Sequence, residues 1–77
     1  MTRAELLERL QREGIPAGCY SLDGRLPVFE GLVLTQRTDR WTIEYCERGM
    51  CRELEVCTAE DDAYVRMYQL LCRYFRG

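Results

Sequence analysis

The chain has 77 residues, which is the size of one domain, so we expect a single domain over residues 1–77. Its composition, 47% apolar and 31% charged, is typical of a folded protein and excludes a disordered one. No apolar run approaches the roughly 20 residues of a membrane span, and the first residues carry no export signal. These features predict a soluble cytoplasmic protein that does not bind a membrane.

The formal net charge is −2, and the basic residues are spread along the chain rather than clustered, which argues against direct binding of nucleic acid. All eleven basic residues are Arg. This bias is typical of a GC-rich coding genome and fits a bacterial source.

The residue types required by the common catalytic sites are missing. The chain has no His, no glycine-rich phosphate loop and no Cys-x-x-Cys pair. A hydrolase with paired carboxylates stays open, but a domain of this size leaves little room for a substrate cleft. We therefore expect no enzymatic activity, no cofactor and no metal site.

Five cysteines could form disulfides or remain as thiols: Cys19, Cys46, Cys51, Cys57 and Cys72. Their number is odd and no secretion signal accompanies them, so the reduced form is favoured over disulfides.

The first element is predicted to be a helix over about residues 3–13. Thr2 and Glu5 have the spacing of a capping box, in which each side chain satisfies a free backbone N–H of the other. Gly14, followed by Ile15-Pro16, is a helix stop. A short edge strand is expected within residues 19–22, and Asp23-Gly24 predicts a turn.

Three strands should follow, over residues 29–37, 41–46 and 51–57, with a tight turn at Arg48-Gly49 between the last two. With a two-residue turn, we expect the register to pair Glu47 with Met50, Cys46 with Cys51, Glu44 with Glu53, Ile43 with Leu54, and Trp41 with Val56. This register joins apolar residues on one face.

A last helix is predicted over about residues 60–75, capped by Thr58 and carrying acidic residues in its first turn. The fold class is therefore α+β, with two layers: an N-terminal helix, a three- to four-stranded antiparallel meander and a C-terminal helix. Both helices should cover the sheet face that carries Trp41, Ile43, Leu54 and Val56. The opposite face should then be open to solvent.

Two features suggest a partner-binding surface. Glu44, Glu53 and Glu55 are expected on the open face, with Glu47 and Glu30 nearby. This face is either simply solvated or a docking surface for a basic partner, whose charges would neutralise the opposed glutamates. Aromatic residues in the connections, chiefly Tyr20 and Phe29, are either interface anchors or part of the core.

Several motifs resemble those of small bacterial immunity proteins encoded beside polymorphic or contact-dependent toxins. The resemblance runs over nearly the full length and is most specific in Tyr20-Ser21-Leu22-Asp23-Gly24 and in the segment from Trp41 to Gly49. It departs from the group's pattern at Arg25, Val28-Phe29 and Cys46.

The resemblance implies a protein that neutralises a cognate toxin domain by stoichiometric binding. Acidic residues would then match a basic substrate groove, such as that of a nuclease. The alternative is another interaction module without catalysis, such as a homodimeric adaptor or regulator that uses the sheet or its exposed edge.

Overall fold

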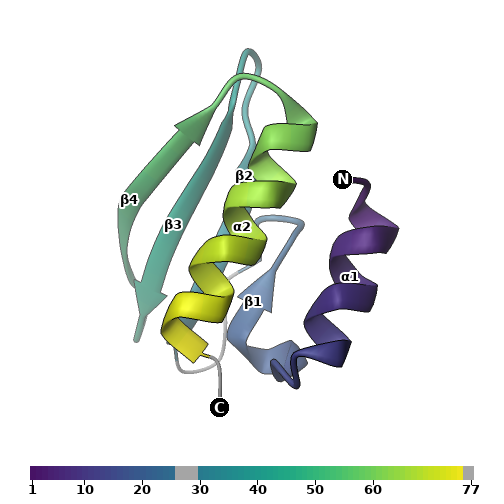
Figure 1. The fold of residues 1–77 in the computed structure, drawn as a ribbon. Coiled ribbons are helices and arrows are strands. Elements are labelled where there is room, and N and C mark those ends of the chain that lie inside the picture. The colour runs from purple at the N-terminus through teal and green to yellow at the C-terminus, as the bar shows by residue number, and fades with distance from the viewer. Residues whose placement is uncertain (26–29, 76–77) are drawn as a thin grey trace.

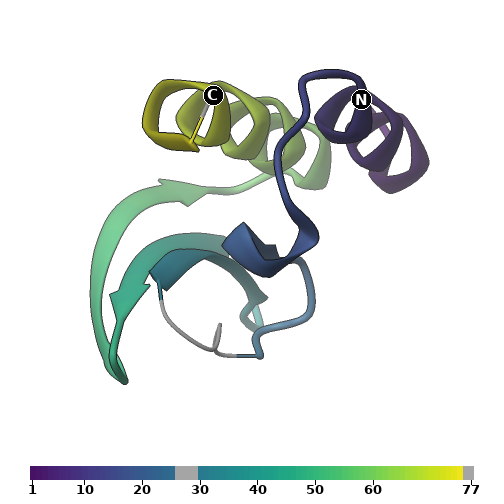
Figure 2. The same ribbon diagram turned by 90° about the horizontal axis from the view of Figure 1, so that it is seen from below.

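The fold is α+β, with two helices on one side of a four-stranded sheet (Figure 1, Figure 2). The computed structural model describes residues 1–25 and 30–75. The elements follow the chain as α1 (Arg3–Arg12), the short 3-10 helix η1 (Ala17–Cys19), β1 (Tyr20–Ser21), β2 (Glu30–Gln36), β3 (Trp41–Glu47), β4 (Met50–Cys57) and α2 (Glu60–Phe75). The predicted fold class is confirmed, and the bounds of the long elements agree within one residue. The predicted start of β2, Phe29, lies outside the described residues.

Helix α1 is bounded by the two predicted signals. The Thr2 hydroxyl accepts a hydrogen bond from the Glu5 amide at 3.1 Å, and the Glu5 carboxylate accepts one from the Thr2 amide at 3.0 Å. At the other end Gly14 has a φ of +74°, and the Ile15 amide donates back to the Leu10 carbonyl at 3.0 Å. Glycine reaches this left-handed conformation without a steric penalty, so the helix ends here.

The sheet has the order β1-β2-β3-β4. Strands β2, β3 and β4 form the predicted antiparallel meander, whereas β1 runs parallel to β2, with Tyr20 beside Leu32. The predicted turn after β1 is local and does not close a hairpin. In this turn the Ser21 hydroxyl donates to the Asp23 carboxylate at 2.8 Å, and the Arg25 amide donates to the same oxygen at 3.3 Å.

The β3–β4 hairpin has the predicted turn and only part of the predicted register. Arg48 and Gly49 both have positive φ, 52° and 83°, as a two-residue type I′ turn requires. Three of the five predicted pairs are confirmed: Glu47 with Met50, Cys46 with Cys51 and Glu44 with Glu53.

Beyond these pairs the predicted register is wrong, because a β-bulge leaves Leu54 without a partner. Ile43 then pairs with Glu55, Thr42 with Val56, and Trp41 with Cys57. One extra residue reverses the alternation of faces. Val56 consequently leaves the core side and is 45% exposed, and Cys57 joins the core.

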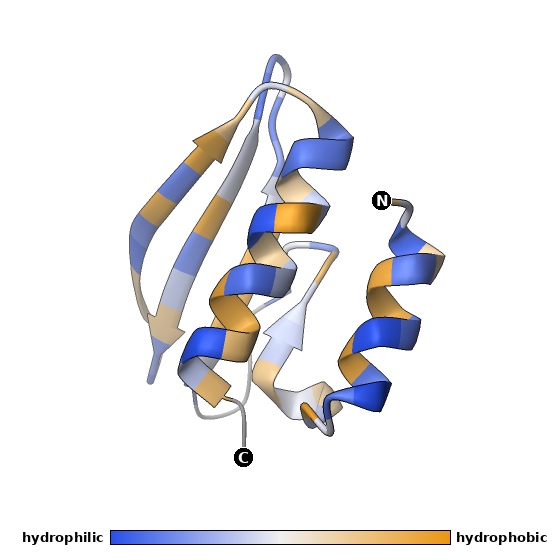
Figure 3. Ribbon diagram, in the orientation of Figure 1, coloured by the Kyte–Doolittle hydropathy of each residue, from blue (hydrophilic) through white to orange (hydrophobic). Residues whose placement is uncertain are grey.

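The core lies between the helices and the sheet. The ribbon coloured by hydropathy shows that apolar and polar positions alternate along β4, and that each helix carries both kinds of residue (Figure 3). The fully buried core residues are Leu6, Leu10, Leu32, Leu34, Ile43, Ala63, Met67 and Leu71. A hydrogen bond of 3.0 Å from the Tyr68 hydroxyl to the Glu13 carboxylate joins α2 to the end of α1. The position of α2 decides what is exposed near the end of the hairpin, because its last turn lies beside that hairpin (Figure 1).

Candidate protein-interaction site

The predicted acidic face keeps only two of its three central glutamates. Glu44 and Glu53 lie opposite each other on β3 and β4, as predicted. The Glu44 side chain is 25% exposed and forms an ion pair with Arg37 at 3.9 Å, whereas Glu53 is exposed on the edge strand. Two opposed carboxylates weaken a pair of strands, and Arg37 offsets this effect only for Glu44.

Glu55 lies on the other side of the sheet, so its predicted place on the acidic face is wrong. The bulge at Leu54 turns the Glu55 side chain toward α2, where the Arg66 guanidinium donates to its carboxylate at 2.9 Å. The pair is about one third exposed and connects β4 to the helix. Glu55 therefore has a partner within the chain and is not available as a contact on the opposite face.

The sheet face away from the helices is also less open than predicted. Val33, Thr42 and Cys46 lie on it, and each is almost completely buried. Gly24, in the turn after β1, lies so close that a Cβ atom on it would be 3.6 Å from the Thr35 hydroxyl oxygen. Among the residues that the structure describes, the middle of this face is therefore closed, and its β4 side, with Glu53 and Val56, is exposed.

The other two predicted glutamates come together beside the β3–β4 turn. Glu30 and Glu47 are direct partners in the β2–β3 register, on the same face as Tyr45. The Tyr45 hydroxyl donates a short hydrogen bond to the Glu30 carboxylate and lies 3.5 Å from the Glu47 carboxylate. The hydrogen bond to Glu30, together with the negative charges of both glutamates, raises the pKa of Tyr45 to about 12.

This raised pKa predicts a distinct alkaline titration. Folding favours the protonated Tyr45, so its contribution to stability is complete below the ordinary pKa of 10.0 and is lost as the pH rises through about 12. Glu30→Gln removes the charge that holds the proton and should move the last tyrosine ionisation to lower pH. The measurement is phenolate absorbance against pH, with circular dichroism followed in the same samples. Superimposable curves for the wild type and Glu30→Gln would contradict the assignment.

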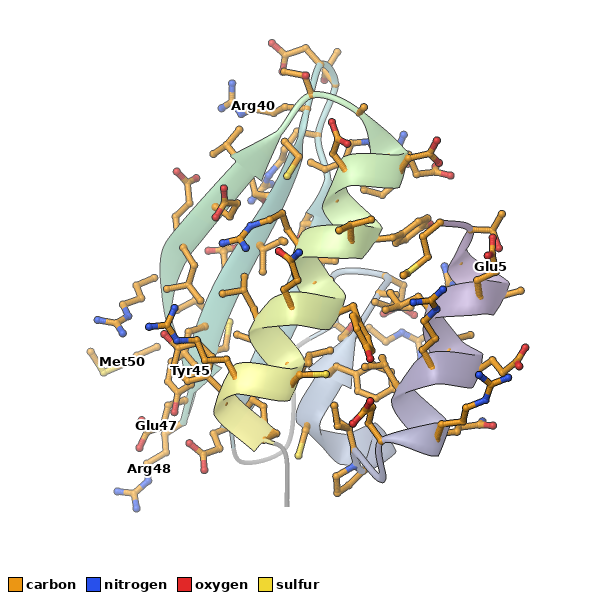
Figure 4. All side chains as sticks on the ribbon, viewed as in Figure 1. Glu5, Arg40, Tyr45, Glu47, Arg48 and Met50 are labelled. Atoms are coloured by element: carbon orange, nitrogen blue, oxygen red, sulfur yellow. A yellow bond between two sulfur atoms is a disulfide. The ribbon has the colours of Figure 1, made fainter. Side chains whose placement is uncertain are left out.

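An open groove, here termed the Tyr45 groove, lies between the β3–β4 hairpin and the last turn of α2. It has a volume of about 670 Å³ and is lined by Tyr45, Glu47, Arg48, Met50, Cys51, Arg52 and Tyr74. Tyr45, Glu47, Arg48 and Met50 gather at this end of the sheet, whereas Arg40 lies at the opposite end (Figure 4).

Exposed apolar and aromatic groups form the wall of the groove. Met50 is 79% exposed and Tyr74 is 47% exposed, which are high fractions for side chains of this size. The rings of Tyr45 and Tyr74 are 6.1 Å apart between centroids, and the Arg52 guanidinium lies 5.9 Å from the Tyr45 centroid. The groove therefore combines an aromatic surface with the long, flexible side chains of Met and Arg, which can adapt to a partner.

The sequence interpretation did not identify Met50, Arg52 or Tyr74 as contact residues. Tyr74 has the helical spacing of the apolar core residues of α2, so the sequence suggests a core position. The structure shows that Tyr74 lies in the last turn of the helix, where its ring is partly exposed. Met50 follows a turn glycine in a strand, a position that sequence alone cannot place inside or outside.

Of the two alternatives for Tyr20, an interface anchor or a part of the core, the structure supports the core. Tyr20 is half-buried on β1 and lies against the core cluster. Phe29, the other aromatic candidate, lies outside the described residues. Tyr20 is therefore not part of the Tyr45 groove.

The prediction that all five cysteines are free thiols is wrong for one pair. Cys46 and Cys51 are opposite each other in the hairpin, with Cα atoms 4.0 Å apart, and form a disulfide. Cys19, Cys57 and Cys72 are free. The two-residue turn brings Cys46 and Cys51 face to face, and neighbouring cross-strand side chains are close enough for a bond.

Within residues 1–25 and 30–75, no group of three or more metal-binding side chains is close enough to hold an ion. The helices in the same ranges are too short or too polar to cross a membrane. Comparison with known proteins finds no matching family model, curated protein or solved structure.

Proposed function

We propose that this chain is a non-catalytic binding protein whose contact surface is the Tyr45 groove. The observation that carries the proposal is the exposure of Met50, at 79%, beside the half-exposed Tyr74 and next to Arg52. Aromatic residues, Met and Arg are the types enriched in the centres of protein interfaces. An exposed Met costs stability in water and gains most when a partner covers it.

The charges beside the groove favour a basic partner. Glu30 and Glu47 oppose each other beside the groove, whereas Glu44 and Glu53 oppose each other on the other face of the sheet. Arg or Lys residues of a partner in the groove would neutralise the Glu30–Glu47 pair, which would speed association and fix its orientation.

The resemblance to immunity proteins suggests which partner this is. We propose a cytoplasmic immunity protein that inhibits a cognate bacterial toxin domain by one-to-one binding. A nuclease toxin fits the acidic Glu30–Glu47 pair best, because its substrate groove is basic. Met50 and Tyr74 would supply most of the affinity as buried anchors, and the glutamates would mainly raise the association rate.

The test is a titration of the toxin domain encoded beside this gene, by calorimetry and by inhibition of the toxin's activity. Met50→Ala and Tyr74→Ala should each weaken binding by about 2 kcal/mol, or roughly 30-fold, because each removes a buried anchor. Val65→Ala is the matched control: Val65 is 36% exposed on α2 but does not line the groove. If all three variants bind equally well, the groove is not the contact surface.

One feature favours the alternative of a homodimeric adaptor or regulator. Strand β4 is an edge strand of eight residues, and most of it is exposed. Its bulge and its charged residues, Arg52, Glu53 and Glu55, are devices that oppose edge-to-edge pairing. Sedimentation equilibrium separates the two functions, since a stable dimer in the absence of toxin supports the alternative.

A further inference from the structure

The disulfide joins an interior strand to the free edge of the sheet. Cys46 lies on β3, and on its other side its register partner is Gly31 of β2. Cys51 lies on β4, which ends the sheet order. The disulfide therefore points from β3, which has β2 on its other side, toward the edge of the sheet, where β4 is the last described strand.

The two sulfur-bearing residues differ sharply in access. Cys46 is 1% exposed, whereas Cys51 is exposed. A thiolate that attacks a disulfide approaches the attacked sulfur from the side opposite to the leaving sulfur, and access decides which sulfur reacts. For Cys51 this side is the free edge of the sheet. For Cys46 it lies over Gly31 of β2, against which the Cys19 backbone packs.

We infer that Cys51 is a site of thiol–disulfide exchange with small thiols, and that the hairpin disulfide is a reversible crosslink. The thiolate of the small thiol forms a new S–S bond to Cys51. The Cys46–Cys51 bond breaks, and Cys46 leaves as a thiolate that takes a proton from water. A second small thiol then attacks the mixed disulfide and releases Cys51 as a thiolate. Overall the protein disulfide gains two electrons, and two small thiols are oxidised to one disulfide.

Two other free thiols of the chain, Cys19 and Cys57, are poor competitors for this role. Burial raises the pKa of the Cys19 thiol, and the charge of Glu30 adds to the effect. Burial likewise raises the pKa of the Cys57 thiol, with Glu55 as a further cause. A raised pKa leaves less of the reactive thiolate. We therefore expect neither Cys19 nor Cys57 to take the place of a small thiol in this exchange.

The exchange also affects the Tyr45 groove, because Cys51 lines it next to Met50. Opening the crosslink frees β4 from β3 at Cys51, directly beside Met50, and would weaken partner binding because the wall of the groove is then held less firmly. This consequence rests on the proposed function, whereas the exchange itself does not.

The first experiment uses no partner. The oxidised protein is treated with limiting glutathione, free thiols are alkylated, and the mixed disulfide is located by mass spectrometry of peptides. The adduct should lie on Cys51 rather than Cys46, by on the order of tenfold, because access selects the sulfur. A predominant adduct on Cys46, or equal amounts on both, overturns the inference.

Two matched variants give an independent readout. Cys46→Ser leaves the exposed Cys51 thiol, and Cys51→Ser leaves the buried Cys46 thiol. The first should react faster with oxidised glutathione in the folded state, and the difference should vanish in denaturant. Equal rates in the folded state contradict the assignment.

The effect on the groove is tested separately, with the toxin domain and protein already shown to carry the adduct on Cys51. Weaker toxin binding than that of the disulfide form supports regulation of the groove. Unchanged toxin binding overturns the proposed regulation. The assignment of Cys51 as the exchange site is then still decided by the mass-spectrometric location of the adduct.

Discussion

Replacing Gly31 with Ala should destabilise the protein by about 2–3 kcal/mol, the upper part of the range for overpacked positions. A Cβ atom at this position would lie 2.4 Å from the carbonyl oxygen of Cys19 and 2.7 Å from its carbonyl carbon. Both are backbone atoms, so no side-chain rotation relieves the clash. Either η1 or strand β2 has to move, and β1, which follows η1, loses its parallel pairing with β2.

The measurement is the free energy of unfolding from urea titration, supported by thermal melting. In a domain of this size the loss corresponds to roughly 10–20 °C in the melting temperature. Gly18→Ala is the control, because a Cβ atom at Gly18 meets nothing within 4 Å. If Gly31→Ala is no worse than Gly18→Ala, η1 does not lie against β2 as described.

Ile43→Thr should lower the free energy of unfolding by about 2–4 kcal/mol. Ile43 is fully buried in the middle of β3. The substitution removes apolar volume from the core and places a hydroxyl where water does not reach. Because small domains are only marginally stable, a large fraction of the protein should be unfolded at 37 °C.

Val56→Thr is the matched comparison and tests the β-bulge. The predicted register placed Val56 on the core face, whereas the structure leaves it 45% exposed opposite Thr42. Threonine keeps the branched shape, so the expected change is within about 0.5 kcal/mol, as for other surface substitutions. A loss as large as that of Ile43→Thr would show that the bulge is absent and that the uninterrupted register is correct.

The parts of the fold that could be predicted are those whose signals lie within a few residues of each other. The Thr2–Glu5 capping box and Gly14 bound α1 because the hydrogen bonds that start and end a helix are local. The Arg48-Gly49 turn could be predicted for the same reason, and it sets the first four pairs of the hairpin, including Cys46 with Cys51.

The candidate site could be predicted only in part, because it depends on distant contacts. Glu30 and Glu47 are seventeen positions apart in the sequence, and the β2–β3 register alone brings them together at Tyr45. Met50 and Tyr74 form one groove only because α2 ends beside the hairpin. Nothing in the local pattern of either residue distinguishes a core position from an exposed one.

By itself the sequence determined the type, order and bounds of the helices and long strands, because periodicity, caps and turns are short-range properties. The tertiary structure decided which way Glu55 and Val56 face, since a single unpaired residue, Leu54, reverses the alternation of a strand. The bulge brings Glu55 to Arg66 on α2 and Cys57 to the core. The Glu55–Arg66 ion pair and the burial of Cys57 both require that α2 already packs on the sheet.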